Sequence, residues 1–363
     1  MPISTITPLP TPPAVSPPAN IVPEPTAVAS ADRLGRFHLL HELGRGSNGA
    51  VYLAHDPIID RQVAIKTFNP RLTPVERKRH RQQLINEARA AGRLSHPNIV
   101  TIFEANWDND IAYIAMEYLP GRELHKLLAN SERFSASDSA QLIRRLTEAM
   151  QYAHQNGVIH RDIKPANIFV LADQQPKLVD FGIARAPNRL SNALADADQP
   201  YTLFHRNLLG TPNYMSPEQA LGKQVDARTD IYSLGAVLYE MLTNRKPFAS
   251  ENSEQLMQKI AYQAPTSPHD LDTNIALELS DICMKALSKR PEKRYQDAQE
   301  MALALRRYLV RQKRGKGSHI SAKPAADLED ADELENPRRK QLFWLGCTAL
   351  VAALMIIGVG LLH

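Results

Sequence analysis

The sequence predicts an α+β protein in two parts, a β-rich first part with one helix and a larger, mainly helical second part. Strand-type alternation of apolar and polar residues runs from Arg36 to Glu117, interrupted by one helical pattern. From Ser135 onward, apolar residues recur at helical spacing, apart from two short strand patterns. No internal repeat of fixed period is visible, so we do not expect a repeat architecture.

The composition is that of a chain that mostly folds. Of its 363 residues, 43% are hydrophobic and 23% are charged, and the formal net charge of +4 is small for this length. Nucleic-acid binding proteins carry a concentrated basic face, so we expect no nucleic-acid partner. The two cysteines, Cys283 and Cys347, argue against a disulfide framework and favour a reducing compartment. The N-terminus lacks a basic segment followed by an apolar one, so we expect no signal peptide.

The first part begins with three predicted strands. The stretches RFHLLHELGRGSNGAVYLAHD, from Arg36, and QVAIKTF are β-rich and contain a glycine turn. A helix is expected over 73–96, where Thr73 is a suitable N-cap. Two further strands are expected at 99–103 and Ile111–Glu117.

The second part should be helical until about Leu309, with short strands at Ile168–Leu171 and 177–178. The predicted folded region is therefore 36–309. Its expected boundaries are an N-lobe at 36–117 and a C-lobe at 120–309.

Two segments flank this region. Residues 1–31 are dense in proline and nearly free of charge, so we expect a disordered, extended arm; docking on a proline-reading partner is the alternative. Residues 310–341 carry basic, acidic and again basic blocks, which is typical of a flexible linker.

The stretch 342–362, LFWLGCTALVAALMIIGVGLL, contains no charged residue. As a helix it would be about 31 Å long, which matches a bilayer core of about 30 Å. The alternative is a buried core helix, but we expect a single-pass transmembrane helix. The basic residues Arg338 to Lys340 before it predict that the folded region lies in the cytoplasm, anchored to the cell membrane.

The glycines of GRGSNG, Gly44, Gly46 and Gly49, follow a spacing that dinucleotide-binding folds also use. There the turn opens a helix, whereas here the chain continues as a strand. We therefore expect a β-turn-β flap whose backbone amides can approach phosphate, with a plain hairpin turn as the alternative.

Two charged residues in apolar surroundings predict an ion pair. Lys66 ends the apolar strand of VAIK, and Glu87 interrupts the apolar stripe of the expected helix. A pair between them would explain both and leave the lysine near nucleotide phosphates; a solvated lysine and a surface glutamate are the alternatives.

The stretch 158–170, VIHRDIKPANIFV, places charged and amide side chains between apolar ones, and DFG follows at Asp180. Together with GRGSNGAV, VAIK, SPE and RPEKRY, these motifs resemble those of eukaryotic-type (Hanks-type) serine/threonine protein kinases, most of all the bacterial transmembrane ones. The resemblance covers roughly Arg36 to Leu309 and implies a bilobal protein kinase fold, followed here by the C-terminal transmembrane helix.

The resemblance also implies roles in phosphoryl transfer. Asp162 is the expected catalytic base, with Lys164 and Lys66 beside the phosphates. Asn167 and Asp180 are oxygen ligands suited to Mg²⁺, with Mn²⁺ as an alternative metal, so ATP and Mg²⁺ are the expected cofactors. The implied ATP-binding residues are Leu43, Gly44, Arg45, Gly46, Ser47, Asn48, Gly49, Val51, Ala64, Lys66, Glu117 and Leu119. Met116 would close the rear of the adenine pocket.

Other residues are implied to support the site. Glu218 and Arg294 form a buried ion pair in this family, and Asp230 braces the backbone of the catalytic loop. Lys164 and the loop GTPNYMSPE are typical of enzymes that phosphorylate serine and threonine hydroxyls of proteins.

Regulation is implied by Arg161, which in the family stays unpaired until an activation-loop residue is phosphorylated. The expected phosphosite is Thr202, with Thr211 second, modified by a second copy of the chain through self-association. Two alternatives to an active protein kinase stay open, a pseudokinase scaffold and a small-molecule kinase.

Overall fold

The computed structural model describes residues 33–46, 49–68, 88, 91–108, 111–130, 132–181 and 212–317. The chain divides after Tyr308 into two compact units. Of the second unit the structure describes 309–317, the end of one helix. The expected proline-rich arm at 1–31 lies outside the described residues.

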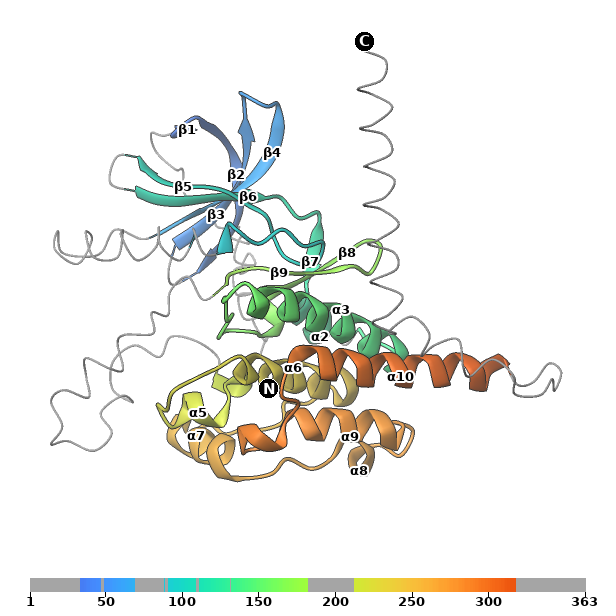
Figure 1. The fold of residues 1–363 in the computed structure, drawn as a ribbon. Coiled ribbons are helices and arrows are strands. Elements are labelled where there is room, and N and C mark those ends of the chain that lie inside the picture. The colour runs from blue at the N-terminus through green and yellow to red at the C-terminus, as the bar shows by residue number, and fades with distance from the viewer. Residues whose placement is uncertain are drawn as a thin grey trace, which may run out of the picture. The chain divides into compact units, whose positions relative to one another are not determined.

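A six-stranded antiparallel sheet forms the N-terminal lobe (Figure 1). In spatial order its strands are β1 (Arg33–Leu34), β2 (Phe37–Gly46), β3 (Gly49–Asp56), β4 (Arg61–Thr67), β6 (Ile111–Glu117) and β5 (Ile102–Asp108). The three strands expected from Arg36 onward, and the one at Ile111–Glu117, are confirmed. They form because their apolar residues alternate and so share one face, where Phe37, Ile65 and Tyr113 are buried in one cluster.

The strand expected at 99–103 begins later, at Ile102. Ile99 pairs instead with Leu178 in a parallel bridge, and the Val100 N–H donates to the Leu178 carbonyl at 2.9 Å. The backbone before Ile102 is therefore hydrogen-bonded to the second lobe. Most of the helix expected over 73–96 lies outside the described residues, but its members Ala88, Ala91 and Leu94 are buried.

The C-terminal lobe combines a small sheet with helices. The sheet contains β7 (Gly121–Glu123), β8 (Ile168–Leu171) and β9 (Pro176–Leu178), so both expected strands are confirmed. The α-helices are α2 (Leu124–Ala129), α3 (Ala136–Gln155), α5 (Pro217–Ala220), α6 (Arg228–Thr243), α7 (Ser253–Tyr262), α8 (Pro268–Leu271), α9 (Leu277–Ala286) and α10 (Ala298–Gly317). The 3₁₀ turns in the described part of this lobe are η1 (Pro165–Asn167), η3 (Pro212–Tyr214) and η4 (Pro291–Lys293).

Helix α6 is the centre of this lobe and is buried along most of its length. It packs against α3 on one side and α9 on another (Figure 1). A Cβ at Gly235 would lie 2.7 Å from the Cβ of Ala286, so glycine permits this close approach of α6 to α9. A helix that is apolar on most faces is expected where helices surround it.

The last helix is longer than the sequence analysis predicted. We expected it to end near Leu309, but α10 continues to Gly317. The basic residues Arg311, Lys313 and Arg314 lie near its end, where cations interact favourably with the helix dipole. The first residues of the expected linker are therefore helical.

Within the described ranges, which stop at residue 317, no helix is both long and apolar enough to cross a bilayer. The stretch 342–362 lies outside them, so the expected transmembrane helix stays a prediction.

Candidate functional site

The two lobes meet at an ion pair between Lys66 and Asp180. Lys66 lies on β4 of the large sheet, and Asp180 follows β9 of the small one. The Lys66 Nζ lies 2.6 Å from Asp180 Oδ2. Both side chains are partly exposed, so they remain accessible at the surface of the site.

Asp162, Lys164 and Asn167 form a second cluster on the loop before β8. The Lys164 Nζ donates to Asp162 Oδ2 at 2.8 Å. Asn167 Nδ2 donates to the carbonyl oxygen of Asp162 at 2.8 Å and to its carboxylate at 3.2 Å. The 3₁₀ turn η1 begins with Pro165, whose fixed φ suits that position, and ends at Asn167.

The two clusters are joined through the backbone, because the Val179 N–H donates to the Asn167 carbonyl at 3.0 Å. Val179 directly precedes Asp180. The structure therefore brings together the four residues that the sequence placed at the reacting centre: Lys66, Asp162, Asn167 and Asp180.

Buried Asp230 on α6 is hydrogen-bonded to the backbone just before Asp162. Its carboxylate accepts the N–H groups of His160 and Arg161, at 2.9 and 2.8 Å. The Nε2 of His154 on α3 lies 2.8 Å from the same carboxylate. Asp230 therefore satisfies two backbone donors that the loop itself leaves unpaired.

Two residues beside the reacting groups have left-handed backbone conformations. Arg161 has φ of 64° and Asp180 has φ of 59°. Such φ values are unfavourable for residues with a side chain and persist only where surrounding contacts hold them. Asp230 fixes the N–H of Arg161, and Lys66 holds the carboxylate of Asp180.

An apolar cluster is shared by the two lobes. Ala64, Val100, Met116 and Leu119 are its buried members. Partly buried residues pack against it from both lobes, namely Val51, Phe169, Leu171 and Val179. A flat apolar group between the lobes would contact residues of both sheets.

The connector after β6 carries a backbone donor, the Leu119 N–H, beside this cluster. The Glu117 N–H donates to the Thr101 carbonyl at 2.9 Å, and the Leu119 carbonyl accepts from Gly121 at 2.9 Å. The Leu119 N–H makes no hydrogen bond to any described residue. This donor is therefore available to a ligand.

Gly44 and Gly46, at the end of β2, have open space around them. A Cβ at Gly44 or Gly46 would meet no atom within 4 Å, so the packing of the protein does not require glycine there. Gly49 differs, since it has φ of 148° and a Cβ there would lie 1.8 Å from the Thr67 carbonyl oxygen. The side chain of Arg45 pairs with Glu42 on the same strand. Leu43 is exposed.

Glu218 and Arg294 form a bidentate ion pair beneath the site, at 2.7 Å for each oxygen. The Thr229 hydroxyl also donates to Glu218 at 2.7 Å. Burial alone would raise the pKa of the Glu218 carboxyl, but the hydrogen bonds from Arg294 and Thr229 outweigh it and hold that pKa below its usual value. The carboxylate is therefore charged and fully paired.

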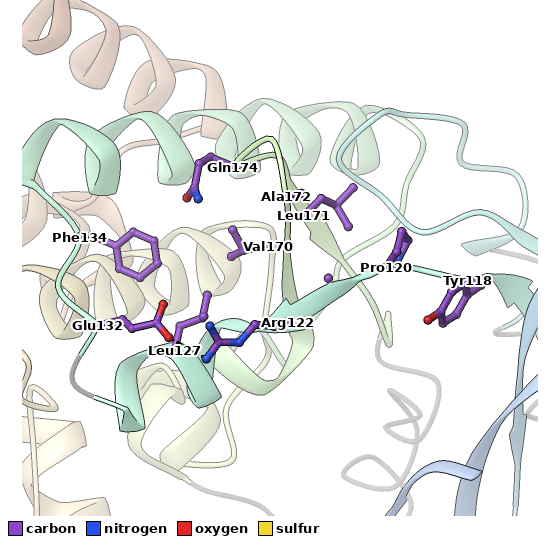
Figure 2. A pocket seen from close by; sticks show the side chains of 11 residues that line it. Tyr118, Pro120, Arg122, Leu127, Glu132, Phe134, Val170, Leu171, Ala172 and Gln174 are labelled. Carbon is purple, nitrogen blue, oxygen red and sulfur yellow. Dashed lines mark ion pairs between the residues drawn. The ribbon is translucent and has the colours of Figure 1, made fainter. Parts of the chain in front are cut away.

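A separate pocket of about 470 Å³ lies beside the connector, between α2 and the small sheet. Figure 2 shows Phe134, Val170 and Leu127 around it, with Arg122 facing Glu132. These two form an ion pair of 2.7 Å. The pocket is lined by none of the four clustered residues Lys66, Asp162, Asn167 and Asp180.

Comparison with known proteins identifies the family. The model of the protein kinase domain matches residues 37–304. This chain belongs to the protein kinase family. The match lies inside the folded region expected from the sequence, 36–309.

The kinase is similar to curated bacterial proteins. It is 39% identical over 273 residues to a probable serine/threonine-protein kinase of Streptomyces coelicolor, SCO3848, covering 74% of this chain and 39% of that protein. It is 37% identical over 272 residues to serine/threonine-protein kinase PknB of Mycobacterium tuberculosis, covering 73% and 42%. This chain thus spans about two fifths of the length of these relatives.

Solved structures share the fold. The crystal structure of the PknI kinase domain of Mycobacterium tuberculosis matches with a TM-score of 0.59 at 24% identity, covering 77% of this chain and 99% of that one. The bilobal arrangement of a sheet-rich and a helix-rich lobe is therefore that of a protein kinase.

Several predicted kinase residues lie outside the described ranges. They are Ser47, Asn48, Glu87, Thr202 and Thr211. The expected ion pair of Lys66 with Glu87 therefore stays a prediction. Within the described residues, Lys66 pairs with Asp180.

The kinase structure also shows contacts that the sequence reasoning missed. Phe169 and Val179 join the apolar cluster, and the Gln219 side chain donates to the Arg161 carbonyl at 2.8 Å. Strand alternation could have found Phe169, since Ile168 and Val170 face the opposite, buried side. No local signal pointed to Gln219, which lies far from Arg161 in the sequence.

The donor set of the kinase site fits a hard cation. Because Asn167 donates through Nδ2, its Oδ1 has no hydrogen bond from the described residues. That oxygen and the Asp180 carboxylate are the ligand types that Mg²⁺ prefers. Across the described ranges, no group of three or more His, Cys, Asp and Glu side chains could hold a metal by itself. The remaining ligands would come from substrate phosphates.

Proposed function

We propose that this chain is a serine/threonine protein kinase that transfers the terminal phosphoryl group of Mg²⁺-bound ATP to hydroxyl groups of proteins. The observation that carries the proposal is the set of contacts that brings these residues together: Lys66 pairs with Asp180, the preceding residue Val179 bonds to Asn167, and Asn167 bonds to Asp162. The names of the similar bacterial proteins support the same activity and substrate class.

Each clustered residue has one task in this reaction. The hydroxyl oxygen of the protein substrate forms a bond to the terminal phosphorus, and the bond from that phosphorus to the ADP oxygen breaks. The hydroxyl proton passes to the Asp162 carboxylate. Lys164 and Lys66 offset the negative charge on the phosphoryl oxygens, and Asn167 and Asp180 would hold the Mg²⁺ ion, which would supply further positive charge there.

The nucleotide has a matching place between the lobes. The adenine would lie in the apolar cluster around Ala64 and Met116, with the Leu119 N–H as a hydrogen-bond donor. The phosphates would lie under the glycine turn, where Gly44 and Gly46 leave space for them.

We further propose control by phosphorylation of Thr202 or Thr211 by a second copy of the chain. The support is Arg161, whose Nε is buried and has no hydrogen-bond partner among the described residues. A phosphate from the activation loop would supply that partner. The proposed anchor is the apolar stretch 342–362, which would hold the kinase at the cytoplasmic face of the cell membrane.

The test is transfer of labelled phosphate from ATP to casein or myelin basic protein, followed by acid hydrolysis of the product. We expect phosphoserine and phosphothreonine with the wild type, and at least a 100-fold lower rate with Asp162→Asn. Labelling of a small metabolite without labelled protein would contradict the proposed substrate class. Equal labelling by both proteins would contradict the role of Asp162.

A further inference from the structure

A partly buried ion pair links the start of the connector between the lobes to the strand that precedes Asp180. The Lys177 Nζ on β9 lies 2.7 Å from each carboxylate oxygen of Glu117, the last residue of β6. Lys177 is only 9% exposed. A lysine buried to this extent needs a paired anion, so the two side chains hold each other in place.

Glu117 is fixed to the N-terminal lobe on its other side. Its carboxylate accepts the Thr101 N–H at 3.2 Å, and its own N–H donates to the Thr101 carbonyl at 2.9 Å. One residue therefore bonds both to Thr101 and to β9 of the C-terminal lobe.

Hydrogen bonds beside this pair complete a seam between β9 and residues 98–101. Leu178 N–H donates to the Asn98 carbonyl and Val100 N–H to the Leu178 carbonyl, each at 2.9 Å. The buried Asn98 side chain donates to the Pro176 carbonyl at 2.7 Å. All three residues of β9 are therefore bonded, Pro176 and Leu178 to residues 98–100 and Lys177 to Glu117.

This seam lies between two parts of the proposed nucleotide site. Asp180 follows Lys177 by three residues, whereas Glu117 begins the connector that carries the Leu119 N–H. The ion pair thus joins the part of the site proposed to bind adenine to the part proposed to bind the cation and phosphates.

We propose that Lys177 and Glu117 are positioning residues that fix the distance between the adenine-binding connector and Asp180. This inference rests on the proposed function and extends it to two side chains that need not touch the nucleotide. A buried ion pair could instead be replaceable by any well-packed apolar pair. Only a nucleotide that occupies both ends of the site distinguishes these two roles.

The experiment compares adenosine, which lacks phosphates, with Mg²⁺-ATP as ligands of the full chain in calorimetric titrations. The variants are Lys177→Met, Glu117→Gln and the exchanged pair Glu117→Lys with Lys177→Glu. The matched control is Arg290→Met, which removes an exposed ion pair with Glu292 far from these contacts in the sequence.

Each single variant should raise the Kd for Mg²⁺-ATP about tenfold and change the Kd for adenosine less than about twofold. The exchanged pair should recover Mg²⁺-ATP binding to within about threefold of the wild type, and Arg290→Met should bind like the wild type. Wild-type affinity in the single variants, equal weakening of both ligands, or an exchanged pair as weak as the single variants would each overturn the proposal.

Two outcomes would prevent this comparison, and each has its own measurement. If Lys177→Met does not fold, the isosteric Glu117→Gln decides the question. If the wild type itself does not bind Mg²⁺-ATP, the proposed function fails, and hydrogen exchange tests the seam alone. Faster exchange of the Val100 and Leu178 amides in Glu117→Gln would then support the ion pair as the element that holds β9, and unchanged exchange would overturn it.

Discussion

Single residues of this kinase work through contacts that reach across the sequence. The ion pair of Glu218 and Arg294 is the most deeply buried example, with Arg294 only 2% exposed. The guanidinium also donates to the carbonyls of Ser288, Arg228 and Lys289. Arg294 therefore joins α5, the start of α6 and the segment just before η4.

Removal of Arg294 should be severe, because it would leave the Glu218 carboxylate buried without its cation. We expect Arg294→Met to lower the free energy of unfolding by about 3–5 kcal/mol. Urea denaturation of wild type and variant at neutral pH measures this difference. A loss comparable to that of an exposed pair, below about 1 kcal/mol, would contradict it.

The same pair predicts a pH dependence. The pKa of the folded Glu218 carboxyl lies below its ordinary value of 4.5, so the unfolded chain binds the proton at a higher pH than the folded chain does. The stabilisation from this group is therefore present above pH 4.5 and is lost as the pH falls through the folded pKa. We expect Glu218→Gln to show a smaller loss of stability on acidification than the wild type. Parallel curves of unfolding free energy against pH for the two proteins would contradict this.

Among the elements, the short helix α5 is bonded to the loop that carries Asp162. Ser216 and Gln219 form a capping box at its start. The Gln219 side chain accepts the Ser216 N–H and also donates to the carbonyl of Arg161, a residue with a left-handed backbone. The cap of α5 is therefore also a brace for the residue before Asp162.

Loss of this brace should affect catalysis more than stability. Gln219→Ala should lower the free energy of unfolding by about 1 kcal/mol, as loss of a cap usually does, and reduce kcat by about tenfold. Ser267→Ala is the control, because it also removes one capping hydrogen bond, from the Asp270 N–H to the Ser267 hydroxyl at the start of α8, and Ser267 has no contact with Arg161 among the described residues. Equal kcat values for the two variants would show that the Arg161 contact has no catalytic effect.

The sequence correctly predicted those strands whose apolar residues follow a repeated local pattern. Strands β2, β3, β4, β6 and β8 have alternating apolar residues or motif context, and they form where expected. β1, β7 and α2 were missed because each is short and depends on a neighbour for its hydrogen bonds. The end of α10 was placed too early because charged residues suit a helix C-terminus as well as a linker.

Among the residues of the site, too, those in local sequence motifs were predicted and those defined by distant contacts were not. Lys66, Asp162, Asn167 and Asp180 were found through motifs that group them along the sequence. Lys177 and Gln219 were not, since their partners Glu117 and Arg161 lie about 60 residues away. A contact between such distant positions leaves no local pattern, so only the folded structure shows it.

At the scale of the whole molecule, the expected membrane anchor distinguishes this chain from an isolated kinase domain. A double substitution in the centre of 342–362, Ala352→Arg with Ile356→Arg, should abolish insertion, because each central arginine costs about 2.5–3.5 kcal/mol. Leu362→Arg, at the end of the stretch, is the control and should insert like the wild type. Flotation of the full chain with membranes measures this, and equal flotation of all three would contradict the anchor.

The proposed function assigns nucleotide binding and phosphoryl transfer to different residues of one cluster, so substitutions should separate the two. The decisive measurement is the Kd for Mg²⁺-ATP together with the turnover rate, for wild type, Asp162→Asn and Asp180→Asn. We expect Asp162→Asn to bind Mg²⁺-ATP within about threefold of the wild type with at least 100-fold slower turnover, and Asp180→Asn to lose the Mg²⁺-dependent part of binding. Wild-type turnover in Asp162→Asn, or Mg²⁺-dependent binding unaltered in Asp180→Asn, would contradict a shared reacting centre.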